Sequence, residues 1–384
     1  MAEHGAEGPD NTEKPGKGLG RLGAFERNML VLMLAVAFTL VALEAGFRVR
    51  AYVAESGLAE RKAMIVQGLK DGSYQAGGEV YGFMVRPSAD PRLVFELRPN
   101  MNWPYQGATV YTNMNGFRDE HYPFAKPPQT VRVFGIGDSV MFGQGVEQGR
   151  EYLAQLEFAL NTVYNTVNWE VINAGVPDYN TPLEVQMLRS KGLKFSPDLV
   201  VLGVVSNDFQ IPEFLQFTGM PEHLTIGRYL DPTRSFLKQY ALQRINRMES
   251  KVPLLPEEYM NLAGRASAGR ALKELAAMAR EQGFEVMLVF LTSEKGELER
   301  LYMRAAETYG FTVADVEPAI REYMSNNGIE DYYASPEMVV PDKHPSALTH
   351  RIATYAIIEA MKKSGVGHRL MDKALGATAP ERAE

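Results

Sequence analysis

Five short apolar segments alternate with segments of helical pattern from residue 131 onward. The apolar segments are VRVFGIGD, WEVINAG, PDLVVLGVVSND, FEVMLVFLTS and FTVADVE. Strands that are apolar on consecutive residues are typical of a parallel sheet buried on both faces, because the connecting helices cover both sides. The sequence therefore predicts a three-layer α/β domain over residues 131–364.

Residues 209–262 interrupt this alternation after the third apolar segment. They contain RSFLKQYALQRINRMESK, in which Phe236, Tyr240, Ile245 and Met248 approximate one helical stripe. In one interpretation such an amphipathic helix covers a sheet edge. In the other, the segment is a lid or substrate wall, because insertions after the carboxyl ends of strands overhang the binding crevice of an open α/β sheet.

An uninterrupted apolar run, NMLVLMLAVAFTLVALEAGF, occupies residues 28–47. At about 1.5 Å per residue it is long enough to cross the roughly 30 Å core of a bilayer. A buried core helix would show a polar face, and a signal peptide would have a short basic start and a better cleavage site than Leu43-Glu44-Ala45. We therefore expect a transmembrane anchor over residues 28–47. Basic residues flank it on both sides, so charge alone does not set its orientation.

The remaining segments have simpler patterns. Residues 1–27 are rich in Gly, Glu and Lys, which predicts a disordered tail. Residues 48–130 begin as a helical stalk and continue as short pieces broken by Pro, Gly and Asn, which predicts a small β-rich extension. Residues 365–384 are expected to form a carboxyl-terminal tail.

Composition limits the class of function. The chain has 384 residues, 45% of them hydrophobic and 23% charged, which is typical of a globular protein with a sizeable core. The formal net charge of -7 argues against a nucleic-acid partner, which would need a basic surface. The chain has no cysteine, which excludes disulfides, thiolate metal sites and a cysteine nucleophile.

The first apolar segment ends in Gly137-Asp138-Ser139. A strand that stops there sets the hydroxyl of Ser139 at the carboxyl edge of the sheet, with small neighbours that let another molecule approach. The same tripeptide is an ordinary helix start, because Asp and Ser cap amides and Gly tolerates positive φ. Whether Ser139 is a nucleophile therefore depends on whether the residues at the other strand ends include a base and oxyanion donors.

A catalytic serine needs a base, a group that orients the base, and donors for the oxyanion. His344 stands in a loop before the last helix, with Asp342 two residues ahead of it. Gly175 follows the second apolar segment, where its missing side chain leaves the backbone N–H approachable. Asn207 follows the third segment, and its amide offers two donors. Together with Ser139 they form a candidate hydrolytic site.

These residues resemble the sequence blocks of the SGNH, or GDSL-type, hydrolase superfamily. GIGDS matches the first block with Ser139 as nucleophile, NAG the second with Gly175, SND the third with Asn207, and DKHPS the last with Asp342 and His344. The resemblance implies a flavodoxin-like fold and the hydrolysis or transfer of ester-linked acyl groups, with no metal and no other cofactor. It implies that Ser139, Gly175 and Asn207 bind the oxyanion.

A second resemblance lies upstream of the serine strand. Asn113 and the sequence Gly116-Phe117-Arg118 are similar to an element of bacterial envelope members that carry an amino-terminal membrane segment. This resemblance implies a single-pass protein of the inner (cytoplasmic) membrane, with residues 1–27 in the cytoplasm and the catalytic domain outside it.

The expected function is therefore a membrane-anchored serine esterase that hydrolyses acyl esters, such as O-acetyl groups on an envelope glycan. Its partners would be that substrate and, through residues 28–47, the membrane. Two alternatives stay open: an O-acyltransferase that moves acyl groups onto a polysaccharide, and a non-catalytic envelope scaffold. Val205 stands where the third block usually has glycine, so Gln210 is the other amide that could serve in place of Asn207.

Overall fold

The structure is a computed structural model. It describes residues 23–71, 75–76, 79–80, 84–212, 215–216, 226–248, 255, 259–291 and 296–376.

The α/β domain is built on one parallel sheet of five strands in the spatial order β11-β10-β9-β7-β8. The strands are β7 (Thr130–Ile136), β8 (Asn168–Asn173), β9 (Leu199–Val204), β10 (Glu285–Phe290) and β11 (Thr312–Asp315). The chain enters at β7, adds β8 on one side, and then adds β9, β10 and β11 on the other. Because the direction of winding reverses between β7 and β9, their carboxyl ends border a crevice, where ligands bind in such sheets.

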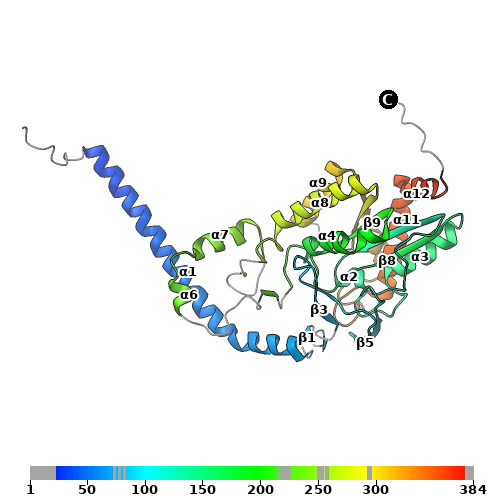
Figure 1. Ribbon diagram of the computed structural model, residues 1–384, viewed down its shortest axis with the longest axis horizontal. Helices are drawn as coiled ribbons and strands as arrows, with labels where there is room; N and C mark the ends of the chain where they lie inside the picture. Colours follow the sequence, from blue (N-terminus) through cyan, green and yellow to red (C-terminus); the bar gives the residue numbers. More distant parts are fainter. Residues whose placement is uncertain are drawn as a thin grey trace, which may run out of the picture.

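Helices cover both faces of the sheet (Figure 1). Successive side chains of β7 point to opposite faces, so Val131 and Val133 pack against α3 and α11, while Phe134 and Ile136 pack against the side formed by α4, α8 and α9. The helical segments of the domain are α2 (Ser139–Phe142), α3 (Tyr152–Val163), α4 (Thr181–Ser190), η1 (Gly192–Phe195), α8 (Arg265–Gln282), α9 (Glu297–Tyr309), α10 (Glu317–Asn326), α11 (Ala347–Ser364) and α12 (Val366–Ala374).

The amino-terminal region contains one long helix, α1 (Ala24–Asp71), which extends away from the α/β domain (Figure 1). In the part of the chain that the structure describes, α1 alone is long and apolar enough to cross a membrane, and its apolar stretch is not buried. Three two-stranded antiparallel sheets follow: β1 (Gln75–Ala76) with β2 (Glu79–Val80), β3 (Val85–Pro87) with β4 (Phe95–Leu97), and β5 (Asn102–Tyr105) with β6 (Ala108–Tyr111). Side chains of this extension, Tyr105, Val110 and Phe117 among them, share a core cluster with Phe134 of the sheet.

The segment after β9 forms two further helices, α6 (Ile226–Leu230) and α7 (Phe236–Ile245). They lie beside α1 (Figure 1). The predicted helix is present, but its apolar stripe is divided: Phe236 and Tyr240 pack against α1, Ile245 is exposed, and Met248 packs against the core cluster of the sheet. Other parts of residues 209–262 lie outside the described residues.

The structure differs from the sequence-based prediction in three places. First, α1 begins at Ala24, so the helix includes the last residues of the predicted 1–27 tail. Second, α10 was not predicted. Third, the predicted 365–384 tail contains α12, because Gly365 turns the chain at φ 71° and two apolar side chains, Val366 and Leu370, are buried against the core. Residues 1–22 and 377–384 lie outside the described residues.

Candidate active site

Ser139 follows β7 directly and opens the short helix α2. The Oδ1 atom of Asp138 accepts a hydrogen bond of 2.9 Å from the backbone N–H of Val140, so Asp138 caps this helix. A Cβ at Gly137 would lie only 2.6 Å from the Cβ of Met141, so the glycine lets the first turn of α2 fold back over the strand. Helix capping and display of the serine hydroxyl are therefore compatible features of the same tripeptide.

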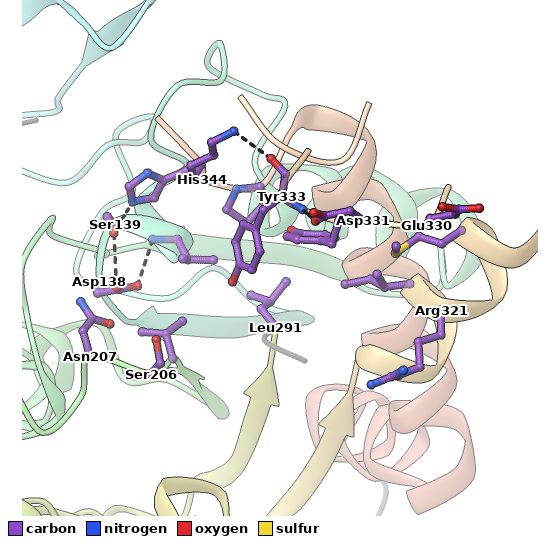
Figure 2. Close-up of a pocket in the computed structure, with 17 residues that line it drawn as sticks. Asp138, Ser139, Ser206, Asn207, Leu291, Arg321, Glu330, Asp331, Tyr333 and His344 are labelled. Carbon is purple, nitrogen blue, oxygen red and sulfur yellow. Dashed lines mark hydrogen bonds between the residues drawn. The ribbon is translucent and has the colours of Figure 1, made fainter. Parts of the chain in front are cut away.

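Ser139, from the start of the domain sequence, lies beside His344, from near its end (Figure 2), and Asp342 lies on the other side of the His344 ring. Ser139 Oγ lies 2.8 Å from His344 Nε2 and 3.3 Å from Asp138 Oδ2, so the histidine is the nearer acceptor for the hydroxyl proton. His344 Nδ1 lies 3.1 Å from Asp342 Oδ2, but the ring N–H is not aligned with this oxygen as in a good hydrogen bond. Such contacts in unliganded sites often tighten when substrate binds.

The loop that carries His344 is held in a tight turn. The N–H of Val340 donates to the carbonyl oxygen of His344 at 2.9 Å, and the N–H of Lys343 donates to that of Val340 at 2.8 Å. Lys343 has a φ of 72°, an unfavourable conformation for a residue with a side chain. Its Nζ donates to the carbonyl oxygen of Tyr333 at 2.8 Å, which anchors the turn to the pocket wall.

The electrostatics suit a histidine base. Burial disfavours protonation of His344, but the neighbouring carboxylates, Asp342 first and then Asp138 and Asp178, outweigh it and raise the pKa of the imidazole above its usual value. Burial raises the pKa of Asp342, yet its contacts with His344 and Gln144 prevail and hold that pKa below its usual range. Asp342 is therefore ionised and stabilises the imidazolium that forms when His344 takes a proton.

Gln144 connects the nucleophile to the acid, and sequence reasoning did not identify it. Its Nε2 donates to Asp342 Oδ2 at 2.8 Å, and its backbone N–H donates to the carbonyl oxygen of Ser139 at 3.0 Å. The hydroxyl of Tyr105, on β5, donates to Gln144 Oε1 at 3.4 Å. The β-rich extension thus supports the orientation of Asp342 through Gln144.

Arg118, from the Gly-Phe-Arg sequence, supports the loop that follows α2. It is fully buried, and its guanidinium donates to the carbonyl oxygens of Phe142, Gly143 and Val146 at 2.8, 2.5 and 2.5 Å. The guanidinium also lies over the Phe142 ring, 4.8 Å from its centroid. Arg118 does not reach the pocket; it satisfies the carbonyl groups left unpaired at the end of α2.

Asn207, the predicted oxyanion donor that follows β9, lies in the loop next to Ser139. Asn207 lines the pocket that contains Ser139 (Figure 2), and Gln210 is not among the lining residues. Asp208 shapes this loop, because its Oδ2 accepts a hydrogen bond of 3.2 Å from the Val205 N–H. In the free protein the Asn207 amide is one of the donors that lower the pKa of Asp138, which burial raises more strongly.

Gly175 has a different environment. A Cβ there would lie 2.5 Å from the backbone nitrogen of Phe142, so glycine is required for the chain to pass this close to α2. Its N–H donates to Asn173 Oδ1 at 3.0 Å, and Gly175 is not among the residues that line the pocket. In this structure its N–H is therefore engaged within the loop.

The pocket around Ser139 has a volume of about 600 Å³. Around Ser139 its lining combines the apolar side chains of Val140, Val205 and Leu291 with the polar ones of Asp138, Ser206 and Asn207. The part of the lining that comes from α10 and the segment before His344 is mixed: Ile320 and Met324 are apolar, and the polar side chains are those of Arg321, Glu330, Asp331, Tyr332, Tyr333 and Lys343. Within the described residues, no group of three or more His, Asp or Glu side chains could hold a metal ion.

His350, one helical stretch beyond His344, is a structural residue. It is fully buried in α11, stacks on the Tyr152 ring and accepts a hydrogen bond of 3.3 Å from the Tyr152 N–H. Burial, helped by the positive charges of Arg118 and His344, lowers its pKa to about 3. It therefore stays neutral and takes no part in the site.

No protein-family model matches the chain, and no curated protein matches it. Solved structures are similar to it at low identity. A mutant of Axe2, an acetyl-xylooligosaccharide esterase from Geobacillus, is 16% identical, with 62% of this chain and 96% of that chain covered and a TM-score of 0.39. TesA is 15% identical, with 60% and 98% covered and a TM-score of 0.39. LAE5, an alpha/beta hydrolase enzyme from the metagenome of Lake Arreo, Spain, is 17% identical, with 60% and 95% covered and a TM-score of 0.37.

Proposed function

We propose that this protein is a serine esterase of the SGNH type, with a three-layer flavodoxin-like domain and Ser139, His344 and Asp342 as its triad. The observation that carries the proposal is the 2.8 Å contact between Ser139 Oγ and His344 Nε2 at the point where the sheet reverses its winding direction. A nucleophile within hydrogen-bond reach of a base, which a third group orients, is the general signature of covalent catalysis.

The chemistry follows from these positions. Ser139 Oγ attacks the acyl carbonyl carbon while its proton passes to His344 Nε2. The intermediate collapses when the imidazolium returns that proton to the departing alkoxide oxygen, which leaves the acyl group on Ser139 and releases an alcohol. Water then repeats the attack with His344 as base, so the products are a carboxylic acid and the regenerated serine.

The oxyanion would be bound by the backbone N–H of Ser139 and the side-chain amide of Asn207, which lines the pocket next to it. Asn207 must then turn from Asp138 toward the substrate oxygen. Gly175, the third predicted donor, can contribute only if its N–H leaves Asn173 Oδ1 during the reaction. Donors of this type act where charge develops, and losing one costs about 10² to 10³ in rate.

The pocket supports a small acyl group on a polar alcohol. The apolar side chains next to Ser139 suit the methyl of an acetyl group, whereas the charged and tyrosine side chains from α10 and the segment before His344 can hydrogen-bond to the hydroxyl groups of a sugar. We propose an O-acetylated glycan of the bacterial envelope as the substrate class. A transferase would use the same acyl-enzyme but let a sugar hydroxyl replace water.

We also propose that residues 28–47 of α1 cross the inner membrane once and that the catalytic domain lies outside the cytoplasm. The span is supported by the length of α1 and by the exposure of its apolar side chains. The orientation is supported by the resemblance to envelope members through residues 113–118. Protease added to intact spheroplasts should digest the catalytic domain; digestion only after lysis would contradict this orientation.

The esterase proposal is tested with the full chain in detergent and p-nitrophenyl acetate as substrate. Ser139→Ala should abolish turnover, whereas Ser206→Ala, which changes another serine of the same pocket, should retain most of it. Thermal unfolding by circular dichroism checks that both variants fold. Equal activity of Ser139→Ala and the wild type would contradict the proposal. Partition of the acetyl group between water and an added oligosaccharide distinguishes hydrolase from transferase.

A further inference from the structure

Hydrogen bonds join α6 and α7 to α1 at two of its residues, Glu44 and Arg48. The Glu44 carboxylate accepts hydrogen bonds from the N–H groups of Phe236 and Leu237, both at 2.9 Å, and from the Ser235 hydroxyl at 3.1 Å. These are the cap and first turn of α7. Arg48 of α1 donates to the carbonyl oxygen of Tyr229 at 2.6 Å. Its other donors reach further carbonyl groups in the segment between α6 and α7, at Asp231 and Arg234.

These two residues lie at the carboxyl-terminal end of the proposed membrane span. Glu44 lies three residues before the end of the apolar run 28–47, and Arg48 is the first residue after it. Groups that hydrogen-bond to both residues must lie where the hydrocarbon core of the bilayer gives way to its headgroups. From there α7 leads away from α1 toward α8 rather than running along it (Figure 1).

The two helices leave large apolar side chains uncovered. Tyr229 and Phe236 are buried against α1, yet Ile226 and Leu230 on α6 are 68% and 67% exposed. On α7, Leu242 and Ile245 are 45% and 79% exposed, and they share one helix face because they are three residues apart. Leu242 and Ile245 also line a cavity of about 630 Å³ together with Met248, Met260 and Leu301. Exposed apolar groups gathered in this way indicate an interaction surface.

The charge of this segment differs from that of the whole chain. Residues 226–247 contain five basic residues and a single acidic one, although the chain has a formal net charge of -7. Lys238 precedes Leu242 by four residues, so it flanks the exposed apolar face of α7, and Arg265 and Arg270 lie at the cavity next to that face. Apolar side chains flanked by Lys and Arg are typical of helices that lie in the surface of an anionic bilayer.

We propose that α6 and α7 form a second membrane contact, in which Ile226, Leu230, Leu242 and Ile245 enter the interfacial region of a bilayer that contains anionic phospholipids. This inference rests on the proposed span of α1. A single spanning helix leaves the catalytic domain free to rotate about the helix axis. A second contact at the membrane surface removes that freedom and sets the height and direction of the pocket.

The absence of cysteine allows a direct test, because each introduced cysteine carries a unique spin label. The full chain is reconstituted in nanodiscs of phosphatidylcholine and phosphatidylglycerol, and the accessibility of each label to oxygen and to a water-soluble nickel chelate is measured. The labelled variants are Ile245→Cys on α7, Val36→Cys in the apolar run, and Tyr355→Cys on α11, which is exposed and far from α1 in sequence. We expect deep membrane accessibility at position 36, interfacial accessibility at position 245 and aqueous accessibility at position 355.

The outcomes separate the contact from the span. A membrane-buried label at position 36 with an aqueous label at position 245 would overturn the second contact and leave the span intact. An aqueous label at position 36 would overturn both. Low accessibility to oxygen and nickel alike at position 245 would mean that another protein surface covers α7, which also overturns the proposal.

Charge reversal gives an independent check. In the Ile245→Cys background, Lys238→Glu and Arg244→Glu should each decrease the ratio of membrane-bound to water-exposed label about 30-fold, since each reversal changes the charge by two units and one unit near an anionic surface contributes about 1 kcal/mol. Nanodiscs of phosphatidylcholine alone should produce a change in the same direction. A ratio that does not depend on either charge or lipid would overturn the role of anionic lipid. Neither substitution touches the pocket, so turnover of p-nitrophenyl acetate should be unchanged.

Discussion

Replacement of Asp342 by asparagine tests how the carboxylate controls His344. Both oxygens of Asp342 face donors: Oδ2 lies 2.8 Å from Gln144 Nε2 and 3.1 Å from His344 Nδ1, and Oδ1 accepts a hydrogen bond of 3.2 Å from the His344 N–H. An asparagine has only one oxygen. In either orientation its NH₂ group must therefore face an N–H donor, and the negative charge beside the imidazole is lost.

The size of the effect follows from which contact fails. If the amide oxygen still faces Nδ1, the loss is the charge-assisted part of the contact, about 1.5–3 kcal/mol, or roughly 10- to 150-fold in rate. If the NH₂ group faces Nδ1, the ring proton moves to Nε2, which can then no longer accept the proton of Ser139, and the loss approaches about 10⁴. We expect kcat to fall between about 10-fold and 10⁴-fold, depending on the orientation of the amide, with little change in KM. Because Asp342 raises the pKa of His344, the acidic limb of kcat/KM should also move to lower pH.

The assay is steady-state hydrolysis of p-nitrophenyl acetate from pH 4 to pH 9, with thermal unfolding as the folding control. Asp331→Asn is the matched variant, because it neutralises another carboxylate of the pocket wall that is not in contact with His344. It should keep kcat near the wild-type value. A kcat for Asp342→Asn within threefold of the wild type, with an unmoved acidic limb, would refute the assignment of Asp342.

Three further predictions concern single residues. Asn207→Ala should lower kcat about 10²- to 10³-fold with little change in KM, whereas Gln210→Ala should not; the reverse result in steady-state kinetics would assign the oxyanion donor to Gln210. Gln144→Glu sets a second carboxylate against Asp342, so the pKa of His344 should rise further and the acidic limb of kcat/KM should move up by about one pH unit; an unmoved limb would remove Gln144 from the site. For His350, the folded-state pKa of about 3 lies below the unfolded value, so the wild type binds fewer protons folded than unfolded and loses stability as pH falls below about 6.5. Between pH 7 and pH 4 its free energy of unfolding in urea should therefore fall by about 3 kcal/mol more than that of His350→Gln, and parallel pH dependences would show that His350 is not held neutral.

The sheet and most of its helices were predictable because their signals are local. Consecutive apolar residues such as those of Leu199–Val204 are buried on both faces, and the amphipathic helices between them have no other way to bury their apolar sides. Helix α10 is not predicted from the sequence, because its first residue, Glu317, closely follows β11 and is the last residue of the predicted strand segment FTVADVE. Helix α12 was also not predicted, because the residues against which Val366 and Leu370 are buried are brought next to them only by folding.

The candidate site was partly predictable for a related reason. Ser139, His344, Asp342 and Asn207 lie at strand ends or before a helix, and a parallel sheet gathers such ends at one edge. Gln144 has no such signature, since its role depends on a contact with a residue 198 positions away. The position of α7 was not predictable either. The stripe of Phe236 and Tyr240 indicates which face is buried, but not that α1 is the element that buries it.

The central claim is that Ser139 is a nucleophile activated by His344. The most direct measurement is peptide mapping of the full chain by mass spectrometry after reaction with a fluorophosphonate, at a series of pH values. The geometry predicts one adduct, on Ser139, whose rate of formation rises with pH as His344 loses its proton, through a midpoint above the usual histidine value. A folded protein that gives no adduct, or an adduct on Ser206 in place of Ser139, would contradict it.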